Sequence, residues 1–237
     1  MIVKNNRIII LFVIISAITI SVFLYSSLFK AGIPSGHDIP LHIFRSKLFI
    51  DALNQGQFPV RWSEWLYPGQ NVPSFNFYPV GFYYLVAIIY FLIPSVSLAF
   101  KTVILLTWLT GGLLMFLYAK RFGLSAGLLA SIIYIFTPYF ILDIFVRGSY
   151  SELTAIVFCT GLLWSLDRFL VSNRLIYSIF LSLFLAGAII SHLPTLVIIT
   201  PVLLGYYLLL KGNGEVKAKN TSIIISLIMG IGLSAFW

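Results

Sequence analysis

Long apolar runs alternate with short polar breaks along most of this chain. Most of these runs reach the roughly 20 residues that an α-helix needs to cross a bilayer, but the run 79–94 is short and ends at Pro94. The pattern predicts an all-α, polytopic membrane protein whose helices are joined by short loops. The apolar runs cover residues 8–29, 79–94, 97–119, 124–141, 151–170, 175–192, 194–210 and 221–237.

Composition supports this class and narrows the partners. Hydrophobic residues make up 60% of the chain and charged residues 9%, and the mean hydropathy is +1.02. No soluble fold hides so large an apolar fraction from water. The net charge of +8 comes from Lys and Arg in loops between apolar runs, so it reports membrane topology rather than a nucleic-acid partner. The single cysteine, Cys159, lies within a run and supplies neither a disulfide framework nor metal-ligand spacing, and we expect no cofactor.

The loop charges decide how the run 79–94 lies, because Lys and Arg gather in cytoplasmic loops. If this run crosses the membrane, four of the 15 Lys and Arg residues fall inside; if it lies along the outer surface, nine do. We therefore predict seven spans, a cytoplasmic N-terminus and a first external loop at 30–96 that carries 79–94 as a juxtamembrane or re-entrant element. Residues 1–237 then form a single transmembrane domain. Because the sequence stops inside an apolar run, we expect it to be the N-terminal part of a longer protein.

The first external loop contains a polar, aromatic segment, residues 30–78, in which chemistry is possible. In GHDIPLHIFRSK, a short helix beginning after Pro40 would place His42 and Arg45 on one face and Asp38 near its N-terminus. An acid, a base and a cation would then lie close together. The alternative at this point is that Asp38 only caps the helix and Arg45 extends toward lipid headgroups.

Two further polar clusters follow, and the predicted topology puts them on the same external face. LDIFVRGSYSEL at 142–153 contains Arg147 and Glu152, and SHLP at 191–194 contains His192. Glu152 falls in the first turn of its helix, where an acid also complements the helix dipole. In the first loop, Arg61 has two alternatives, which are pairing with Glu64 or holding an anionic headgroup. His192 is either a satisfied polar residue or part of the site.

Several catalytic patterns are missing from the sequence. It contains no Gly-rich phosphate loop, no H-E-x-x-H, no G-x-S-x-G and no Cys/His metal set, which disfavours nucleotide hydrolysis and zinc proteolysis. Charges within the middle of the apolar runs are also missing, which disfavours an ion-coupled transporter. Asp167 and Arg168 lie at the inner edge of a predicted span and are interpreted as structural.

The order of these features resembles the type C glycosyltransferase fold. That fold has an N-terminal span, a long external loop with an acidic residue near its start, a juxtamembrane stretch rich in Pro and aromatic residues, and a bundle with short loops. The segments GHDIPLH, GQFPVRW, FNFYP, YIFTPYF to RGSYSE, and SHLP are also similar to prokaryotic 6-pyruvoyl-tetrahydropterin synthase-related membrane proteins, with the YfhO-like proteins as neighbours. The zinc histidines of a pterin synthase are not present as a cluster.

The resemblance to type C glycosyltransferases implies a reaction and assigns roles to residues. The first acidic residue of the external loop, Asp38 here, would be the general base. A polyprenyl-phosphate-linked sugar in the cell membrane would be the donor, and Arg147, with Arg45 or Arg61, would neutralise the leaving phosphate.

The remaining residues would support this step. His42 and Glu152 would orient the acceptor or tune the base, with His192 among the substrate-binding residues. Oligosaccharyltransferases carry paired acids where Glu152 stands alone, so no metal site is predicted. The alternative function is a non-catalytic component of envelope polysaccharide assembly that binds a lipid carrier with the same residues.

Overall fold

The computed structural model describes residues 36–64 and 70–237, together with the single positions 19, 26, 28, 30 and 32. The predicted first span at 8–29 therefore lies almost entirely outside the described residues. The described elements are α2 (Ile39–Asn54), β1 (Ser63–Glu64), β2 (Asn71–Val72), α3 (Ser74–Phe77), α4 (Gly81–Leu92), α5 (Val96–Ala119), the 3₁₀ turn η1 (Lys120–Phe122), α6 (Leu124–Ile135), α7 (Pro138–Leu142), the π-helical turn η2 (Asp143–Arg147), α8 (Tyr150–Ser172), α9 (Leu175–Ser191), α10 (Leu193–Gly212) and α11 (Asn220–Ser234).

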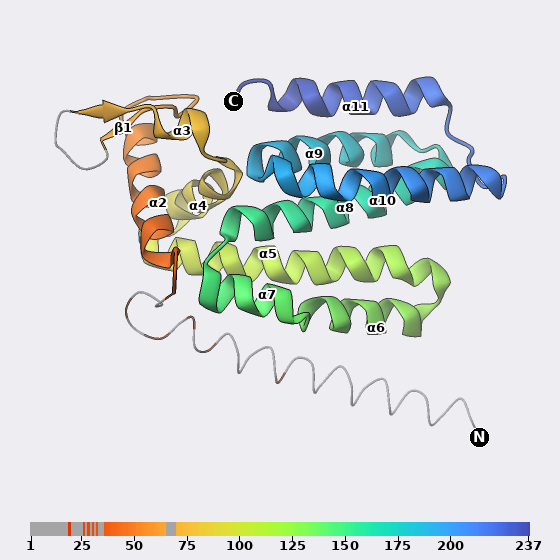
Figure 1. Cartoon of the computed structure of the whole chain (residues 1–237), viewed down its shortest axis with the longest axis horizontal. Helices are drawn as coiled ribbons and strands as arrows, with labels where there is room; N and C mark the ends of the chain where they lie inside the picture. The colour runs from red at the N-terminus through yellow and green to blue at the C-terminus, as the bar shows by residue number, and fades with distance from the viewer. Residues whose placement is uncertain are drawn as a thin grey trace.

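The long helices form a bundle. α5, α6, α8, α9, α10 and α11 run side by side along the long axis of the molecule, and α2 crosses one end of them (Figure 1). α8 is the most buried of the long helices. It packs closely on α9 because an aromatic ring of each helix lies against a glycine of the other. A Cβ on Gly161 of α8 would lie 2.6 Å from the Phe184 ring, and a Cβ on Gly187 of α9 would lie 2.7 Å from the Phe158 ring. This all-α bundle confirms the predicted fold class.

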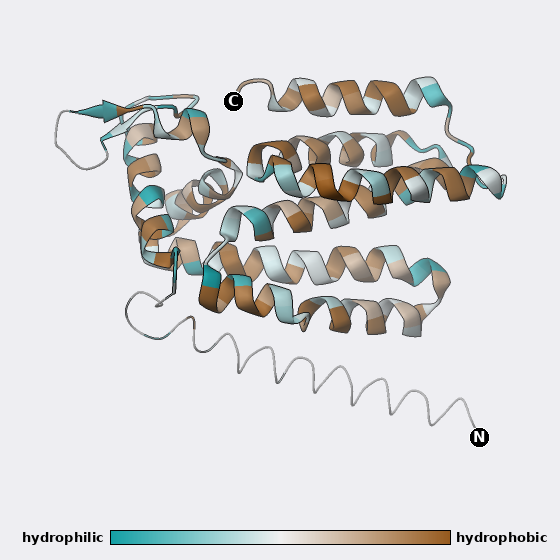
Figure 2. Ribbon diagram, viewed as in Figure 1, coloured by the Kyte–Doolittle hydropathy of each residue, from teal (hydrophilic) through white to brown (hydrophobic). Residues whose placement is uncertain are grey.

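Four helical segments within the described residues are long and apolar enough to cross a membrane. α9, with 17 residues, and α11, with 15, are shorter than the spans expected at 175–192 and 221–237. The run expected at 124–141 extends to Arg147, because α7 and η2 continue it. Hydrophobic residues dominate the bundle helices, and hydrophilic ones gather in β1 and in the loops at the two ends (Figure 2). The four segments are Val96–Phe122, Leu124–Arg147, Tyr150–Ser172 and Leu193–Gly212.

The juxtamembrane element predicted at 79–94 is the helix α4. Its 12 residues are about 18 Å long at 1.5 Å per residue, too short for a hydrocarbon core of about 30 Å. Its first half is buried against α2 and α5, and its last turn is exposed at Phe91 and Leu92. Both α4 and the start of α5 lie at the end of the bundle that α2 crosses (Figure 1).

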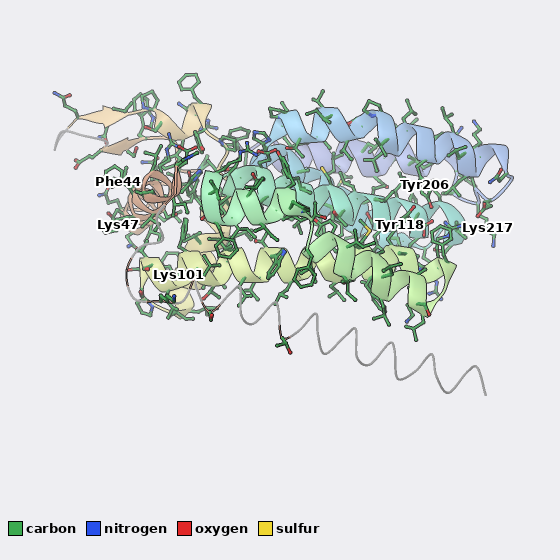
Figure 3. All side chains as sticks on the ribbon, turned by 60° about the horizontal axis from the view of Figure 1, so that its bottom comes forward. Phe44, Lys47, Lys101, Tyr118, Tyr206 and Lys217 are labelled. Carbon is green, nitrogen blue, oxygen red and sulfur yellow. The ribbon has the colours of Figure 1, made fainter. Side chains whose placement is uncertain are left out.

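The polar segments divide between the two ends of the bundle. α2, the short β1–β2 hairpin, the turn into α8 and the turn between α9 and α10 lie at one end, here called the site end (Figure 1). The turn after α5 and the loop between α10 and α11 lie at the other end, where Figure 3 shows Tyr206 and Lys217 far from Phe44 and Lys47. The three polar clusters of the sequence therefore share one end. That this end faces outward stays a prediction.

A network of charged side chains joins the helices at the end of the bundle opposite the site end. Asp167 in α8 is 1% exposed and forms an ion pair with Arg121, and it accepts a hydrogen bond of 2.6 Å from the hydroxyl of Tyr206. Arg121 also pairs with Glu215 at 2.8 Å. These contacts join α8 to η1, α10 and the loop before α11, which is the structural role expected of Asp167.

Candidate functional site

Asp38 lies at the N-terminal end of α2, which is much longer than the short helix expected after Pro40. Pro40 lies in the first turn, where proline is well tolerated. The Asp38 side chain makes no capping hydrogen bond to α2, and the residue is exposed. Its backbone N–H instead donates to the carbonyl of Arg147 at 3.1 Å, and the N–H of His37 donates to Val146 at 2.9 Å. Helix capping by the side chain is therefore not what Asp38 does in this structure.

Gly148 allows the start of α2 to approach the turn before α8. Its φ of +75° lies in the left-handed region, and a Cβ there would lie 2.9 Å from the backbone nitrogen of Ile39. Any side chain at this position would push the Asp38 segment away from η2. Glycine thus brings two predicted site segments, GHDIPLH and VRGSYSE, into direct backbone contact.

His42 is buried, with 2% exposure, among aromatic rings. Its Nδ1 lies 2.8 Å from the hydroxyl of Tyr83, and its ring contacts those of Tyr78 and Tyr150. Burial, and then the charge of Arg45, lowers its pKa to about 4, while the charge of Asp38 opposes that shift. His42 is therefore neutral near pH 7, so it can orient a group by hydrogen bonding but does not store a proton.

Arg45 lies one turn after His42, on the same face as the sequence predicts. Its guanidinium carbon is 3.8 Å from the centre of the Tyr78 ring, a cation–π contact. Burial raises the pKa of Tyr78, and the charge of Arg45 opposes that rise. A cation is thus held beside an aromatic residue that lines the cavity described below.

Arg147 is the centre of an ion cluster. Its guanidinium binds Asp143 Oδ1 at 2.6 Å and Glu152 Oε2 at 3.1 Å, and it donates to the hydroxyl of Tyr139 at 3.0 Å. Glu152 also accepts hydrogen bonds from Tyr139 and, at 3.0 Å, from Ser149. The sequence prediction missed Asp143, although its position four residues before Arg147 on a helix is a signal for such a pair.

A cavity of about 390 Å³ lies between α2, the start of α8 and the turn from α9 to α10. We call it the polar cavity. His192 lies in its wall, with Nδ1 2.7 Å from the hydroxyl of Thr195. Ser151 is 5% exposed, and its Oγ has no hydrogen-bond partner among the described residues. The wall also contains His42, Phe77, Tyr78, Pro79, Ser149, Leu193, Pro194 and Trp237.

Arg61 is not in this cavity wall, but its guanidinium donates to the backbone carbonyl of Trp237, a wall residue, at 3.4 Å. Its guanidinium donates to Asn76 Oδ1 at 3.0 Å and to the backbone carbonyl of Phe236 at 3.0 Å, and the indole of Trp237 donates to the carbonyl of Phe75 at 2.8 Å. Arg61 thus joins the hairpin region to the segment after α11. Of the predicted site residues, the structure brings His42 and His192 into the cavity wall and places Asp38, Arg45, Glu152 and Arg147 around it. It joins Arg61 to the wall only through the backbone of Trp237.

The described residues contain no group of three or more His, Cys, Asp or Glu side chains arranged to hold a metal ion. The ion cluster comes nearest, but Arg147 lies between its carboxylates of Asp143 and Glu152. In its present geometry a guanidinium, and not a metal ion, pairs with both of these acids.

Comparison with known proteins places this bundle in a family. The family model of the 6-pyruvoyl-tetrahydropterin synthase related domain, a membrane protein, matches residues 75–237. The chain belongs to this family. It is also 25% identical over 219 residues to an uncharacterized protein of Lactococcus lactis subsp. cremoris (strain MG1363), an alignment that covers 88% of this chain and 36% of the relative. The chain thus spans about a third of that relative, and no solved structure matches it.

Membership in the 6-pyruvoyl-tetrahydropterin synthase related family confirms the family named from the sequence segments and places the chain in a membrane. The matched range includes Arg147, Glu152 and His192, whereas Asp38 and His42 precede it. The site end is therefore built partly from the family domain and partly from the loop before it.

Proposed function

We propose that this membrane protein binds a polyprenyl-phosphate-linked sugar at the site end and transfers the sugar to an acceptor at the outer face of the membrane. The observation that carries the proposal is the state of Asp38. Its carboxylate is exposed, makes no capping hydrogen bond, and lies near enough to His42 and Tyr78 for its charge to affect both. A carboxyl group beside a cavity whose wall includes His42, Ser149 and Ser151 suits a general base.

The reaction would be a single displacement. Asp38 accepts the proton of an acceptor hydroxyl, the hydroxyl oxygen attacks the anomeric carbon, and the bond from that carbon to the phosphate oxygen breaks. The polyprenyl phosphate leaves with the electron pair, and Asp38 later passes its proton to water. A positive charge near the departing oxygen stabilises this charge separation.

Arg45 suits the leaving phosphate better than Arg147 does. Arg147 already binds Asp143 and Glu152, and these three groups together carry a net negative charge when both acids are ionised. Arg45 lies over Tyr78, whose ring lines the polar cavity. In this proposal Arg147 holds the turn whose backbone binds the Asp38 N–H, and neutral His42, together with His192, orients sugar or acceptor hydroxyls.

The second candidate function is lipid-carrier binding without catalysis. It is favoured by one observation: Asp38 lies beside the polar cavity but is not part of its wall. In that case Arg45 and the cavity hydroxyls would hold a phosphate headgroup, and no bond would be broken.

The test compares Asp38→Asn with Asp51→Asn in the full-length protein. Asp51 is a suitable control because it is an exposed acid on the same helix, paired with Lys47. With a polyprenyl-phosphate-linked hexose as probe, we expect Asp38→Asn to lower transfer by about 10² to 10⁴-fold and to leave probe binding intact. Asp51→Asn should change neither.

Transfer retained in Asp38→Asn would reject the catalytic role. Binding without transfer in the unmodified protein would select the lipid-carrier function. Loss of probe binding in Arg45→Met, with binding retained in Arg61→Met, would further support the choice of cation.

A further inference from the structure

A second cavity lies between α8, α9, α10 and α11, of which α8 and α10 are long and apolar enough to span the membrane. Its volume is about 430 Å³, and its wall is almost entirely aliphatic. We call it the apolar groove. Its lining includes Leu166, Leu181, Leu196, Leu203, Leu204 and Ile223.

The apolar groove follows the same helix that reaches the polar cavity. Leu193 and Pro194, at the start of α10, line the polar cavity, and Leu196, in the same turn, lines the groove. At the far end, the hydroxyl of Tyr207 donates to Asn220 Oδ1 at 3.1 Å, joining α10 to α11. From Leu193 to Leu204, α10 rises about 16 Å at 1.5 Å per residue. One helix thus leads from a polar site into an apolar one.

The lining of the apolar groove indicates what it holds. Ten of its 13 lining residues are Leu or Ile, and the other three are Thr200, Tyr207 and Asn220. Such a wall offers apolar contacts along the helices and almost no partner for a phosphate or a sugar. The groove therefore fits the hydrocarbon chain of a lipid rather than its headgroup.

The bilayer limits what the groove contributes to binding. Lipid tails are as apolar as leucine, so moving a chain from the bilayer into the groove gains no hydrophobic energy. A tail is held there only if its headgroup is held nearby, because the tether then raises its local concentration. The ligand must accordingly be an amphiphile whose polar end has its own site, and the polar cavity lies next to the groove along α10.

We infer that the apolar groove takes the hydrocarbon chain of the lipid whose phosphate end binds at the polar cavity, with the chain running along α10 from Leu193 toward Tyr207. This inference rests on the proposed function and deepens it by giving the substrate a tail path and a direction. Chain length and position, rather than headgroup chemistry, are what the groove recognises.

Site-specific photocrosslinking in the full-length protein, in lipid nanodiscs, tests the path. A photoreactive amino acid replaces Leu204, which lines the groove, or Val202, which does not; they are 55% and 58% exposed on the same helix. The probe is radiolabelled undecaprenyl phosphate. We expect crosslinking at Leu204 to exceed that at Val202 several-fold and to disappear with excess unlabelled undecaprenyl phosphate.

Binding of geranyl phosphate, whose chain is too short to fill the groove, separates the two proposals. If geranyl phosphate binds but the two positions crosslink equally and without competition, the tail path is refuted and the headgroup site stands. If neither probe binds, the headgroup site and the tail path both fall. Competition by ordinary phospholipid at Leu204 would show that the groove holds bulk lipid, which also overturns the inference.

Discussion

Replacing Gly148 by alanine should separate Asp38 from the turn before α8. Gly148 has a φ of +75°, and alanine in the left-handed region costs about 1–2 kcal/mol. The new Cβ would also lie 2.8 Å from Ile39 Cγ1 and 2.9 Å from its backbone nitrogen. Relieving such overpacking costs about 1–3 kcal/mol, and moving α2 away loses the hydrogen bonds of His37 and Asp38, worth about 1 kcal/mol each.

Gly214→Ala is the matched control for this change. Gly214 has nearly the same φ, +72°, but nothing lies within 4 Å of its Cβ position. The two variants therefore share the backbone penalty, and Gly148→Ala alone carries the steric one. We expect Gly148→Ala to be less stable than Gly214→Ala by about 3–5 kcal/mol from the overpacking and hydrogen-bond losses together.

Thermal denaturation in detergent micelles measures the difference in stability between the two variants. Hydrogen exchange followed by mass spectrometry shows which backbone amides become less protected. The peptide containing His37 and Asp38 should exchange faster in Gly148→Ala and not in Gly214→Ala. Equal melting temperatures and equal exchange in both variants would refute the claim that close approach at Gly148 holds Asp38 in place.

Two other predictions concern ionisable groups. Asp167→Asn breaks a buried ion pair with Arg121 and should lower the free energy of unfolding by about 3–5 kcal/mol. Asp51→Asn breaks an exposed pair with Lys47 and should lower it by at most about 1 kcal/mol. Equal melting temperatures of the two variants in detergent would contradict this prediction. His42 has a folded pKa of about 4, below its ordinary 6.5, so only the unfolded chain binds its proton between these values. The free energy of unfolding should thus fall by about 3 kcal/mol as the pH drops from 6.5 to about 4. Melting temperatures measured across this pH range check the prediction. If His42→Asn loses as much stability as the unmodified protein, groups other than His42 cause the loss.

The sequence predicted the elements that depend on local pattern. Apolar length identified the long helices. The charge count, which places α4 along the outer surface, stays a prediction. The extent of α2 was underestimated, because its buried residues, among them Ile39, Phe49 and Ile50, pack into a core with α4 and α5 that a local pattern does not reveal. α9 ends one residue before its predicted run because the backbone of His192 is extended, and α11 ends at Ser234 because the apolar residues after it are not helical.

The candidate site was predictable only where its contacts are local. The shared face of His42 and Arg45 follows from helical spacing, and the pair of Asp143 with Arg147 follows the same rule. The contact of Arg61 with Phe236 joins residues 175 positions apart, and no local pattern encodes it. The unpartnered Ser151 hydroxyl is likewise visible only once α8 meets the other walls of the polar cavity.

The contact between Arg61 and the Phe236 carbonyl also has a consequence for biosynthesis. The hairpin region is made early, but its partner is made only after α2 to α11 have been synthesised. The wall of the polar cavity also includes Trp237, so that wall is completed only after α11 has been made. Contacts this distant in sequence make folding slow, and a ribosome stalled before α11 would hold an inserted bundle with an open site.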